Sequence, residues 1–239
     1  MTHRQAVILA GGKGTRLAPF NTVLPKPLMP LGERSILEIV LRQLDREGFS
    51  EAVLATGYLS EIIEAFCASL EPKLNLSLRV VKEEKPLGTI GPLKWIEGLE
   101  EDFLLMNGDL LTTLPFSAVL ERRREKKSLA LLTVGERTVT LDFGLLETDA
   151  NGAVVRYKEK PSLTNLVSYG VYAFSRDVLD WIPNQEAFDL PDLIQLLIGG
   201  NRRVDTYLYS GYWKDIGRPE DYEAAKADFL ADAERFLGK

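Results

Sequence analysis

A glycine-rich loop with a nearby cation is the first feature of the chain that could do chemistry. Leu9-Ala10-Gly11-Gly12-Lys13-Gly14-Thr15-Arg16-Leu17 directly follows an apolar run. Glycines let the backbone approach a ligand closely and aim consecutive N–H groups at anionic oxygens or at the edge of a base. Arg16, with Lys26 in Pro25-Lys26-Pro27, supplies the fixed cations that a triphosphate requires. The pattern favours a nucleotide-binding loop, and a plain turn is the alternative for the glycines alone.

Two familiar glycine motifs are excluded by single residues of this loop. A dinucleotide fingerprint needs glycine where Leu17 stands, and a Walker A motif needs Ser or Thr directly after a Gly-Lys pair, where Gly14 stands. A nicotinamide-dependent oxidoreductase is therefore disfavoured.

Two carboxylates follow apolar or aromatic segments later in the chain. Asp109 ends Phe103-Leu104-Leu105-Met106-Asn107-Gly108-Asp109, and Asp215 lies within Gly211–Pro219. Two carboxylates with open remaining positions suit Mg²⁺, which completes its shell with waters and substrate phosphates. Each Asp alone is equally compatible with a turn residue or a helix cap, and spacing does not show that the two meet.

The amino-acid composition excludes several classes of catalytic site. The 239 residues include 29 Lys and Arg, 35 Asp and Glu, a single cysteine and a single histidine, His3, with a formal net charge of -6. Without an internal histidine, Ser-His-Asp triads and HExxH zinc sites are excluded, so catalysis depends on carboxylates, Lys, Arg, backbone amides or a hard metal. The acidic balance disfavours a nucleic-acid partner. No apolar stretch approaches the ~18 residues of a membrane span, so we expect a cytoplasmic protein without a membrane partner.

The elements that must position these residues alternate between strand and helix in the first half of the chain. We expect strands at 6–10, 52–55, 76–81 and 103–106, with helices from Ser35 to Gly48 and over 60–70 and 91–99. This rhythm indicates an α/β fold with right-handed crossovers, whose ligands lie beyond the carboxyl ends of the strands.

After about residue 129 the pattern changes to shorter strands, which predicts a mixed or antiparallel region. The expected strands are 129–134, 143–147, 154–158 and 166–174, with Asn151-Gly152 as a hairpin turn. No linker separates the halves. We expect one domain over 1–239, in which about 1–128 bind the nucleotide and about 129–239 the second substrate.

Taken in order, these segments resemble the sugar-1-phosphate nucleotidyltransferases over nearly the whole chain. The matching pieces are the glycine loop, Pro25-Lys26-Pro27, Pro86-Leu87-Gly88-Thr89, Asn107-Gly108-Asp109, Phe143-Gly144, Glu159-Lys160-Pro161, Tyr169-Gly170-Val171-Tyr172 and Asp215-Ile216-Gly217. The resemblance implies a Rossmann-like nucleotidyltransferase fold, with a mixed, mostly parallel central sheet flanked by helices. It also implies transfer of a nucleotidyl group from a nucleoside triphosphate to a sugar 1-phosphate, with release of pyrophosphate.

The resemblance also implies a role for individual residues. Leu9, Gly11, Gly12, Gly14 and Gly88 would hold the nucleotide. Arg16 and Lys26 would hold its phosphates, and Asp109 and Asp215 would hold Mg²⁺. On the sugar side, Lys160 would meet the sugar phosphate, while Gly144, Glu159 and Tyr169 would line the pocket. A sugar phosphate oxygen is already anionic near neutral pH, so its attack on the α-phosphorus needs no general base.

Glu83 directs the choice of base towards guanine. An ionised carboxylate only accepts hydrogen bonds, and guanine presents two adjacent donors, whereas uracil and thymine present one donor between carbonyls. Solvated strand-end charges at Glu83 and Glu84 are the alternative. The same reaction with UTP, dTTP or CTP also stays open, as does an inactive regulatory relative. A GT-A glycosyltransferase is disfavoured because the chain lacks an Asp-x-Asp metal motif. The sugar and the oligomeric state stay open.

Overall fold

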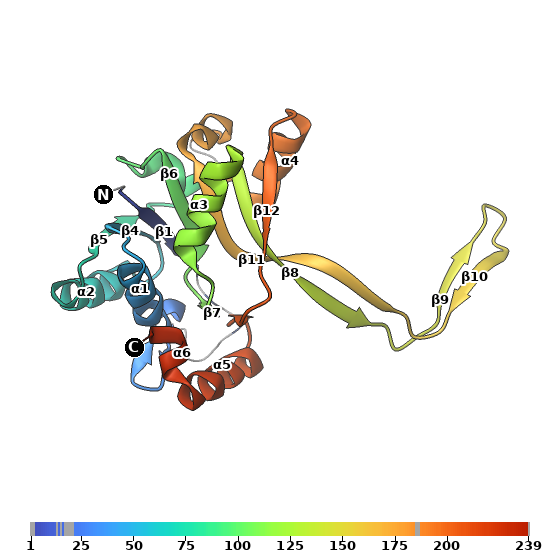
Figure 1. The fold of residues 1–239 in the computed structure, drawn as a ribbon, viewed down its shortest axis with the longest axis horizontal. Helices are drawn as coiled ribbons and strands as arrows, with labels where there is room; N and C mark the ends of the chain where they lie inside the picture. Colours follow the sequence, from blue (N-terminus) through green and yellow to red (C-terminus); the bar gives the residue numbers. More distant parts are fainter. Residues whose placement is uncertain (1–2, 13, 15, 17–21, 185–186, 239) are drawn as a thin grey trace.

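A mixed sheet forms the centre of the molecule in the computed structural model, which describes residues 3–12, 14, 16, 22–184 and 187–238. Within that part of the chain, the strand order of the main sheet is β12-β8-β11-β6-β1-β4-β5 (Figure 1). β11 runs antiparallel to both of its neighbours, and the other pairs are parallel. The expected mixed, mostly parallel sheet is confirmed. The strands are β1 (Gln5–Ala10), β4 (Glu51–Thr56), β5 (Ser77–Lys82), β6 (Asp102–Asn107), β8 (Ala130–Thr140), β11 (Ser162–Ser175) and β12 (Val204–Leu208).

Helices and 3-10 turns cover both faces of this sheet. The helices are α1 (Ile36–Arg46), α2 (Ser60–Leu70), α3 (Phe116–Lys126), α4 (Leu190–Gly199), α5 (Pro219–Ala231) and α6 (Ala233–Leu237). The 3-10 turns are η3 (Lys26–Leu28), η4 (Glu71–Lys73), η5 (Gly91–Trp95) and η6 (Arg176–Trp181). Alternate residues of β1 enter different cores: Ile8 packs in the core with α1, α2 and α3, while Val7 packs in the core with η5, η6 and α4. None of the described helices is long and apolar enough to span a bilayer.

The first helix begins and ends where its sequence signals predict. The Ser35 hydroxyl accepts a hydrogen bond from the Glu38 amide at 3.1 Å, which caps the amino end of α1. After α1 the backbone turns at Gly48 with φ of +74°, a conformation that glycine adopts without a Cβ clash. The predicted helix over 60–70 is confirmed as α2.

The helix predicted over 91–99 is wrong, because only the 3-10 turn η5 forms there. The buried aliphatic side chains Ile90, Leu93, Ile96 and Leu99 recur every third residue in this stretch, and Pro92 is buried beside them. That spacing fits the three residues per turn of a 3-10 helix, in which such side chains lie above one another.

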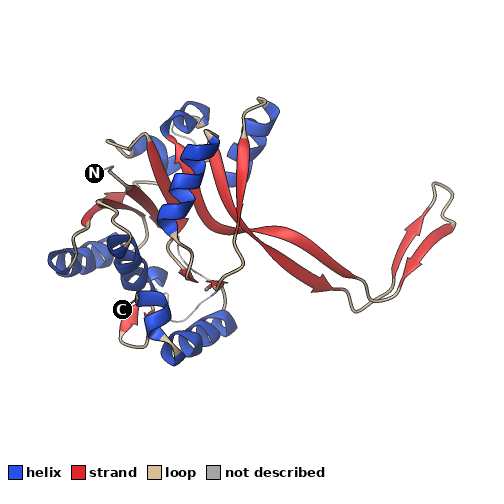
Figure 2. Cartoon of the chain, in the orientation of Figure 1, coloured by secondary structure: helices blue, strands red, loops and turns tan. Residues whose placement is uncertain are grey.

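The second half contains longer strands than expected. Residues 130–135 of β8 and 169–175 of β11 are buried in the body or close to it, but 136–140 and 162–168 continue outward. They lead to the hairpin of β9 (Leu145–Thr148) and β10 (Val154–Lys158), so residues 136–168 form an arm that projects from the body (Figures 1 and 2). The predicted turn at Asn151-Gly152 is confirmed by a hydrogen bond from the Gly152 amide to the Asp149 carbonyl at 3.1 Å.

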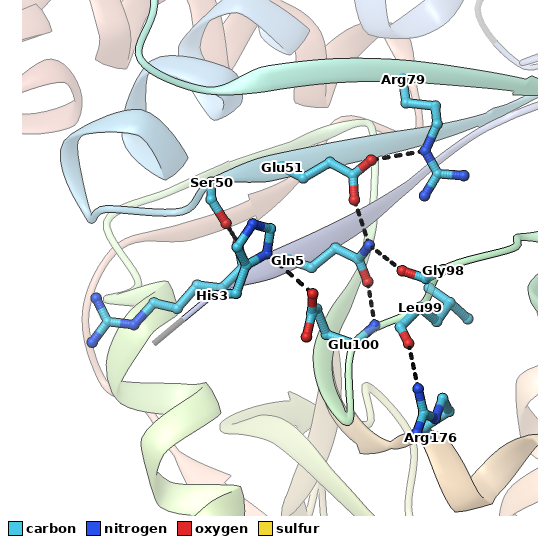
Figure 3. Close-up of polar contacts among 10 residues, drawn as sticks. His3, Gln5, Ser50, Glu51, Arg79, Gly98, Leu99, Glu100 and Arg176 are labelled. Carbon is cyan, nitrogen blue, oxygen red and sulfur yellow. Dashed lines mark hydrogen bonds and ion pairs between the residues drawn. The ribbon is translucent and has the colours of Figure 1, made fainter. Parts of the chain in front are cut away.

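A polar network joins the amino ends of several strands on the side of the sheet away from the predicted site (Figure 3). The buried Gln5 side chain donates to Glu51 and to the Gly98 carbonyl and accepts from the Glu100 amide. Arg79 donates to the other Glu51 oxygen at 2.7 Å. These bonds tie β1, β4 and β5 to the segment that leads into β6.

Candidate active site

The carboxyl ends of β1, β4, β5 and β6 meet at one edge of the sheet, where their loops enclose a cleft of about 800 Å³. The predicted site residues that line this cleft are Leu9, Gly11, Gly12, Glu83, Gly88 and Asp109. Parallel strands place the segments that follow them at the same edge, which explains why positions so far apart in the sequence meet.

Close backbone approach explains several glycines around the cleft. The Gly108 amide donates to the Leu9 carbonyl at 3.0 Å, and a Cβ on Gly108 would lie 2.8 Å from that oxygen. Gly14 has φ of +58° and lies against the Lys26 side chain. Gly88 has φ of +76°, with no room for a Cβ beside the Phe188 carbonyl. Lys13, Thr15 and Leu17 of the loop lie outside the described residues.

Glu83 forms part of the cleft wall beside the glycine loop. Its Oε1 would be 3.0 Å from a Cβ on Gly11, and its Oε2 accepts a hydrogen bond from the Leu87 amide at 3.2 Å. Burial raises the pKa of Glu83, and the Leu87 N–H opposes that rise. One carboxylate oxygen is thus held by the protein, while the other faces the loop.

The two predicted metal carboxylates are brought side by side by a short antiparallel pair. β13 (Trp213–Asp215) pairs with β7 (Leu110–Thr112), so that Asp215 lies opposite Leu110, and the Ile216 amide donates to the Asp109 carbonyl at 3.0 Å. Burial raises the pKa of Asp215, and the neighbouring Asp109 charge raises it further, while Lys26 and Arg16 oppose the shift. The two carboxylates therefore share one electrostatic environment.

Lys26 and Arg16 complete a charged cluster around these carboxylates. The Lys26 ammonium forms an ion pair with Asp109 Oδ2. At Gly217 the position of a Cβ lies 3.6 Å from an Asp215 oxygen and 3.8 Å from Arg16 Nη1, so both groups border the same point. We use the term cation–carboxylate cluster for Arg16, Lys26, Asp109 and Asp215.

The cation–carboxylate cluster fits a magnesium ion. Asp109 Oδ1 is buried and accepts no hydrogen bond from the described residues, so it is free to ligate a cation. The described residues contain no group of three or more metal-binding side chains of the His, Cys, Asp and Glu types. Two carboxylates leave coordination positions open for phosphate oxygens and water, the arrangement that Mg²⁺ commonly adopts.

The predicted sugar-side residues lie mainly on the arm. Tyr157 donates to the Glu159 carboxylate, and a Cβ on Gly144 would lie 2.5 Å from the Tyr157 hydroxyl, so Gly144 and Glu159 meet around this ring. Lys160, in the turn between β10 and β11, has φ of +40°, an uncommon conformation for a residue with a Cβ. Within one chain the arm extends away from the body that carries Asp109 (Figure 1).

Tyr169 lies instead where the arm meets the body. Its ring stacks on Trp213, with centroids 4.1 Å apart and planes 6° apart, and its carbonyl accepts from Trp213 Nε1 at 2.6 Å. A Cβ on Gly135 would lie 1.8 Å from the Tyr169 hydroxyl, so the ring fits only against glycine. Trp213 is absent from the predicted set of site residues, although it lies two residues before Asp215.

Sequence reasoning also missed Asp189, which lines the cleft. Asp189 Oδ1 accepts from the Thr89 amide at 2.8 Å and from the Thr89 hydroxyl at 3.1 Å, and thereby holds the segment around Gly88. Nothing near Asp189 in the sequence signals this contact, because its partner lies 100 residues away.

Comparison with known proteins identifies the family. A model of the family described as Nucleotidyl transferase matches residues 5–232. This chain belongs to the nucleotidyl transferase family. The match includes every predicted site residue of the chain, on the body and on the arm alike.

Individual relatives of this nucleotidyl transferase include two curated proteins. The chain is 33% identical to mannose-1-phosphate guanylyltransferase of Mycobacterium tuberculosis, across 96% of this chain and 66% of the relative. It is 29% identical to UTP--glucose-1-phosphate uridylyltransferase of Synechocystis sp., across 91% of this chain and 61% of the relative. The chain therefore spans just under two thirds of the length of these curated relatives.

A solved structure of similar length also matches this nucleotidyl transferase. HddC from Yersinia pseudotuberculosis complexed with GMP-PN is 26% identical, with a TM-score of 0.72, over 95% of this chain and 99% of that chain.

Proposed function

We propose that the chain transfers a nucleotidyl group from a nucleoside triphosphate, GTP in our assignment, to a sugar 1-phosphate and releases pyrophosphate. The observation that carries this proposal is the cation–carboxylate cluster, whose Asp109 lines the glycine-lined cleft. Lys26 pairs with Asp109, which lines the cleft, and Arg16 lies near Asp215, so both cations would be available to the phosphates of a triphosphate bound there. The proposed partners are these two small substrates in the cytoplasm, without nucleic acid or membrane.

The reaction needs positioning more than proton transfer. An anionic oxygen of the sugar phosphate forms a bond to the α-phosphorus, the bond from that phosphorus to the bridging oxygen breaks, and pyrophosphate leaves with the electron pair. Arg16 and Lys26 reduce the repulsion between the two anionic substrates and hold the triphosphate in line. Asp109 and Asp215 would hold Mg²⁺, which would neutralise phosphate charge and orient the phosphate oxygens.

Glu83 and the relatives together support guanine as the base. Glu83 Oε1 lies beside Gly11 of the loop, while Oε2 accepts from the Leu87 amide. As a carboxylate oxygen, Oε1 would accept hydrogen bonds from the donor groups on the edge of a guanine base. The Mycobacterium tuberculosis relative is named as a guanylyltransferase, and the HddC structure contains GMP-PN. The uridylyltransferase relative makes UTP the second candidate.

The decisive experiment measures pyrophosphate release from each of the four nucleoside triphosphates with a panel of sugar 1-phosphates that includes mannose 1-phosphate and glucose 1-phosphate. We expect turnover that depends on Mg²⁺, is abolished by EDTA and is fastest with GTP. Efficient use of UTP with poor use of GTP would reject the base assignment. Nucleotide binding in calorimetry without turnover of any pair would instead indicate the regulatory relative.

A further inference from the structure

Most of the large apolar side chains that are exposed in the described part of the chain lie on the arm. Among the described residues, nine of the fifteen large apolar side chains that are exposed lie on it. These are Val139, Phe143, Leu145, Leu146, Val154, Val155, Tyr157, Leu163 and Leu166. A concentration of exposed apolar side chains on one segment is typical of an interaction site, because water is displaced from such side chains on contact.

The two ribbons of the arm are amphipathic rather than uniformly apolar. In the β8–β11 ribbon, Val139 lies opposite Leu163 on one face. On the other face, cross-strand hydroxyl pairs join Thr138 to Thr164 and Thr140 to Ser162 at 2.8 and 2.9 Å, and Leu166 lies opposite Glu136 nearer the body.

The β9–β10 hairpin repeats this division. Leu146 lies opposite Tyr157 on one face, while the other face has the Glu147–Arg156 ion pair together with Leu145 opposite Lys158. A two-stranded ribbon is only marginally stable in water on its own, so each apolar face needs a surface to pack against.

The junction with the body directs the arm outward. Tyr169 is stacked on Trp213, and the Arg137 guanidinium lies over the Trp213 ring, 5.3 Å from its centroid. These contacts, together with the continuous pairing of β8 with β11 from body to arm, oppose a turn of the arm back onto its own chain.

This direction separates the two halves of the proposed site. From Ser168 to Ser162 the strand advances by about 3.3 Å per residue, so the turn with Glu159 and Lys160 lies roughly 20 Å beyond the body. The cation–carboxylate cluster lies in the body, and the groups assigned to the sugar phosphate therefore do not reach it within one chain (Figure 1).

We propose that the arm packs on a second copy of this chain and places its Glu159–Lys160 turn beside the Asp109–Asp215 pair of that copy, while the partner's arm does the same in return. This inference rests on the proposed function. A second copy is the occupant that the observations favour, because it offers the nucleotide cleft and the carboxylates that the arm residues lack. Reciprocal exchange between two identical chains closes with two-fold symmetry and completes both sites.

Complementation between two inactive variants tests the proposal. Asp215→Asn impairs the body and leaves the arm intact, while Lys160→Ala does the reverse. The two chains are coexpressed with different affinity tags, and the heterodimer is purified through both tags. If the arm acts in trans, one site of the heterodimer combines the intact body with the intact arm, and about half of wild-type turnover returns. If the arm acts in cis, every site has one defect and the heterodimer is as inactive as its parents.

A second measurement tests the packing without any substrate. Leu163→Lys places a charge on the face of the β8–β11 ribbon that carries Val139. Thr164→Lys places the same charge at the next residue, on the face that carries the hydroxyl pairs. We expect sedimentation to show a wild-type dimer that Leu163→Lys dissociates and Thr164→Lys preserves, with circular dichroism of the body unchanged in both.

Three results would overturn the inference. They are a wild-type monomer at all concentrations, equal effects of the two lysine substitutions on assembly, and a heterodimer without recovered turnover although the wild type is active. A wild-type dimer that turns over no substrate would reject the proposed function instead, while the lysine pair would still decide the packing of the arm.

Discussion

The two carboxylates of the cation–carboxylate cluster have different structural partners, so their amide variants should differ in stability. Asp215→Asn removes one of two neighbouring negative charges, whereas Asp109→Asn also removes the ion-pair partner of the nearly buried Lys26. We expect both variants to lose about 10²- to 10³-fold in turnover. Without metal, Asp215→Asn should melt at or above the wild-type temperature.

Asp109→Asn should instead be destabilised by about 1 to 3 kcal/mol, because a buried charge loses its partner. Pyrophosphate release gives the turnover, and thermal unfolding in EDTA gives the stability. Near wild-type turnover in either variant would show that the carboxylate is structural. Equal melting temperatures for the two variants would show that the Lys26–Asp109 pair contributes nothing.

Glu83 should determine selectivity among bases rather than the rate of the chemical step. Glu83→Gln replaces an acceptor by a group that both donates and accepts, which matches uracil as well as guanine. We expect the preference for GTP over UTP to fall by about 10- to 100-fold, since a mismatched buried hydrogen bond costs about 1 to 3 kcal/mol. The kcat/KM ratio for the two nucleotides measures this effect. Exposed Glu84→Gln is the control, and an equal change in both variants would remove Glu83 from the base site.

At the scale of the element, Gly135 lets β8 pass the Tyr169 ring. A Cβ at this position would lie 1.8 Å from the Tyr169 hydroxyl, and the ring is held by its stack on Trp213. Gly135→Ala should therefore displace the ring and lower the free energy of unfolding by about 1 to 3 kcal/mol, as overpacking does elsewhere. Gly199→Ala is the matched control in α4, because nothing lies within 4 Å of its Cβ position. Denaturant unfolding of both variants decides the point, and equal stability would mean that Tyr169 moves freely.

Hydrogen bonds of Glu51 link the amino ends of β1, β4 and β5, and their contribution to stability depends on pH. Burial raises the pKa of Glu51, but the hydrogen bonds from Arg79 and Gln5 and the charge of Arg79 outweigh it, so the net shift is downward. A lowered pKa in the folded state means that the ionised carboxylate stabilises the fold. This contribution is complete above the ordinary glutamate value of 4.5 and is lost as the pH falls through the lower folded value.

Glu51→Gln should accordingly be less stable than the wild type by about 1 kcal/mol at neutral pH, and the difference should vanish in acid. Denaturant unfolding at a series of pH values measures it. Glu61→Gln serves as the control, because Glu61 forms an exposed ion pair with Lys82 and should have little effect on stability. If the difference in the free energy of unfolding between Glu51→Gln and the wild type did not change with pH, the ionised Glu51 carboxylate would not be what stabilises the fold.

At the scale of the whole molecule, the body should fold without the tip of the arm. Thr140 pairs with Ser162, so residues 141–161 can be replaced by an Asn-Gly turn that closes the ribbon at this rung. The shortened chain retains the main sheet and its cores, and we expect it to unfold cooperatively and to bind GTP. Turnover with a sugar 1-phosphate should fall by at least about 10²-fold, since Lys160 is removed. Calorimetry and pyrophosphate release separate the two effects, and full turnover of the shortened chain would show that the arm tip is dispensable.

The sequence alone determined the features that depend on neighbouring residues. The cap at Ser35, the stop at Gly48, the turn at Asn151-Gly152 and the α/β alternation follow from local hydrogen bonds, glycine conformations and apolar periodicity. The glycine loop also predicts nucleotide binding from the sequence, because the glycines and Arg16 lie within nine consecutive residues.

Tertiary structure alone decided which distant residues meet. Pairing of β13 with β7 brings Asp215 to Asp109, and Asp189 contacts Thr89 in the wall of the cleft; neither contact has a local signal. The direction of the arm also depends on a distant contact, the stack of Tyr169 on Trp213. Alternation of apolar and polar residues predicts strands in this region. The same alternation occurs in a strand that packs on the body and in one that projects into solvent. Burial depends on the surfaces that surround a strand in three dimensions, and only the folded chain supplies them.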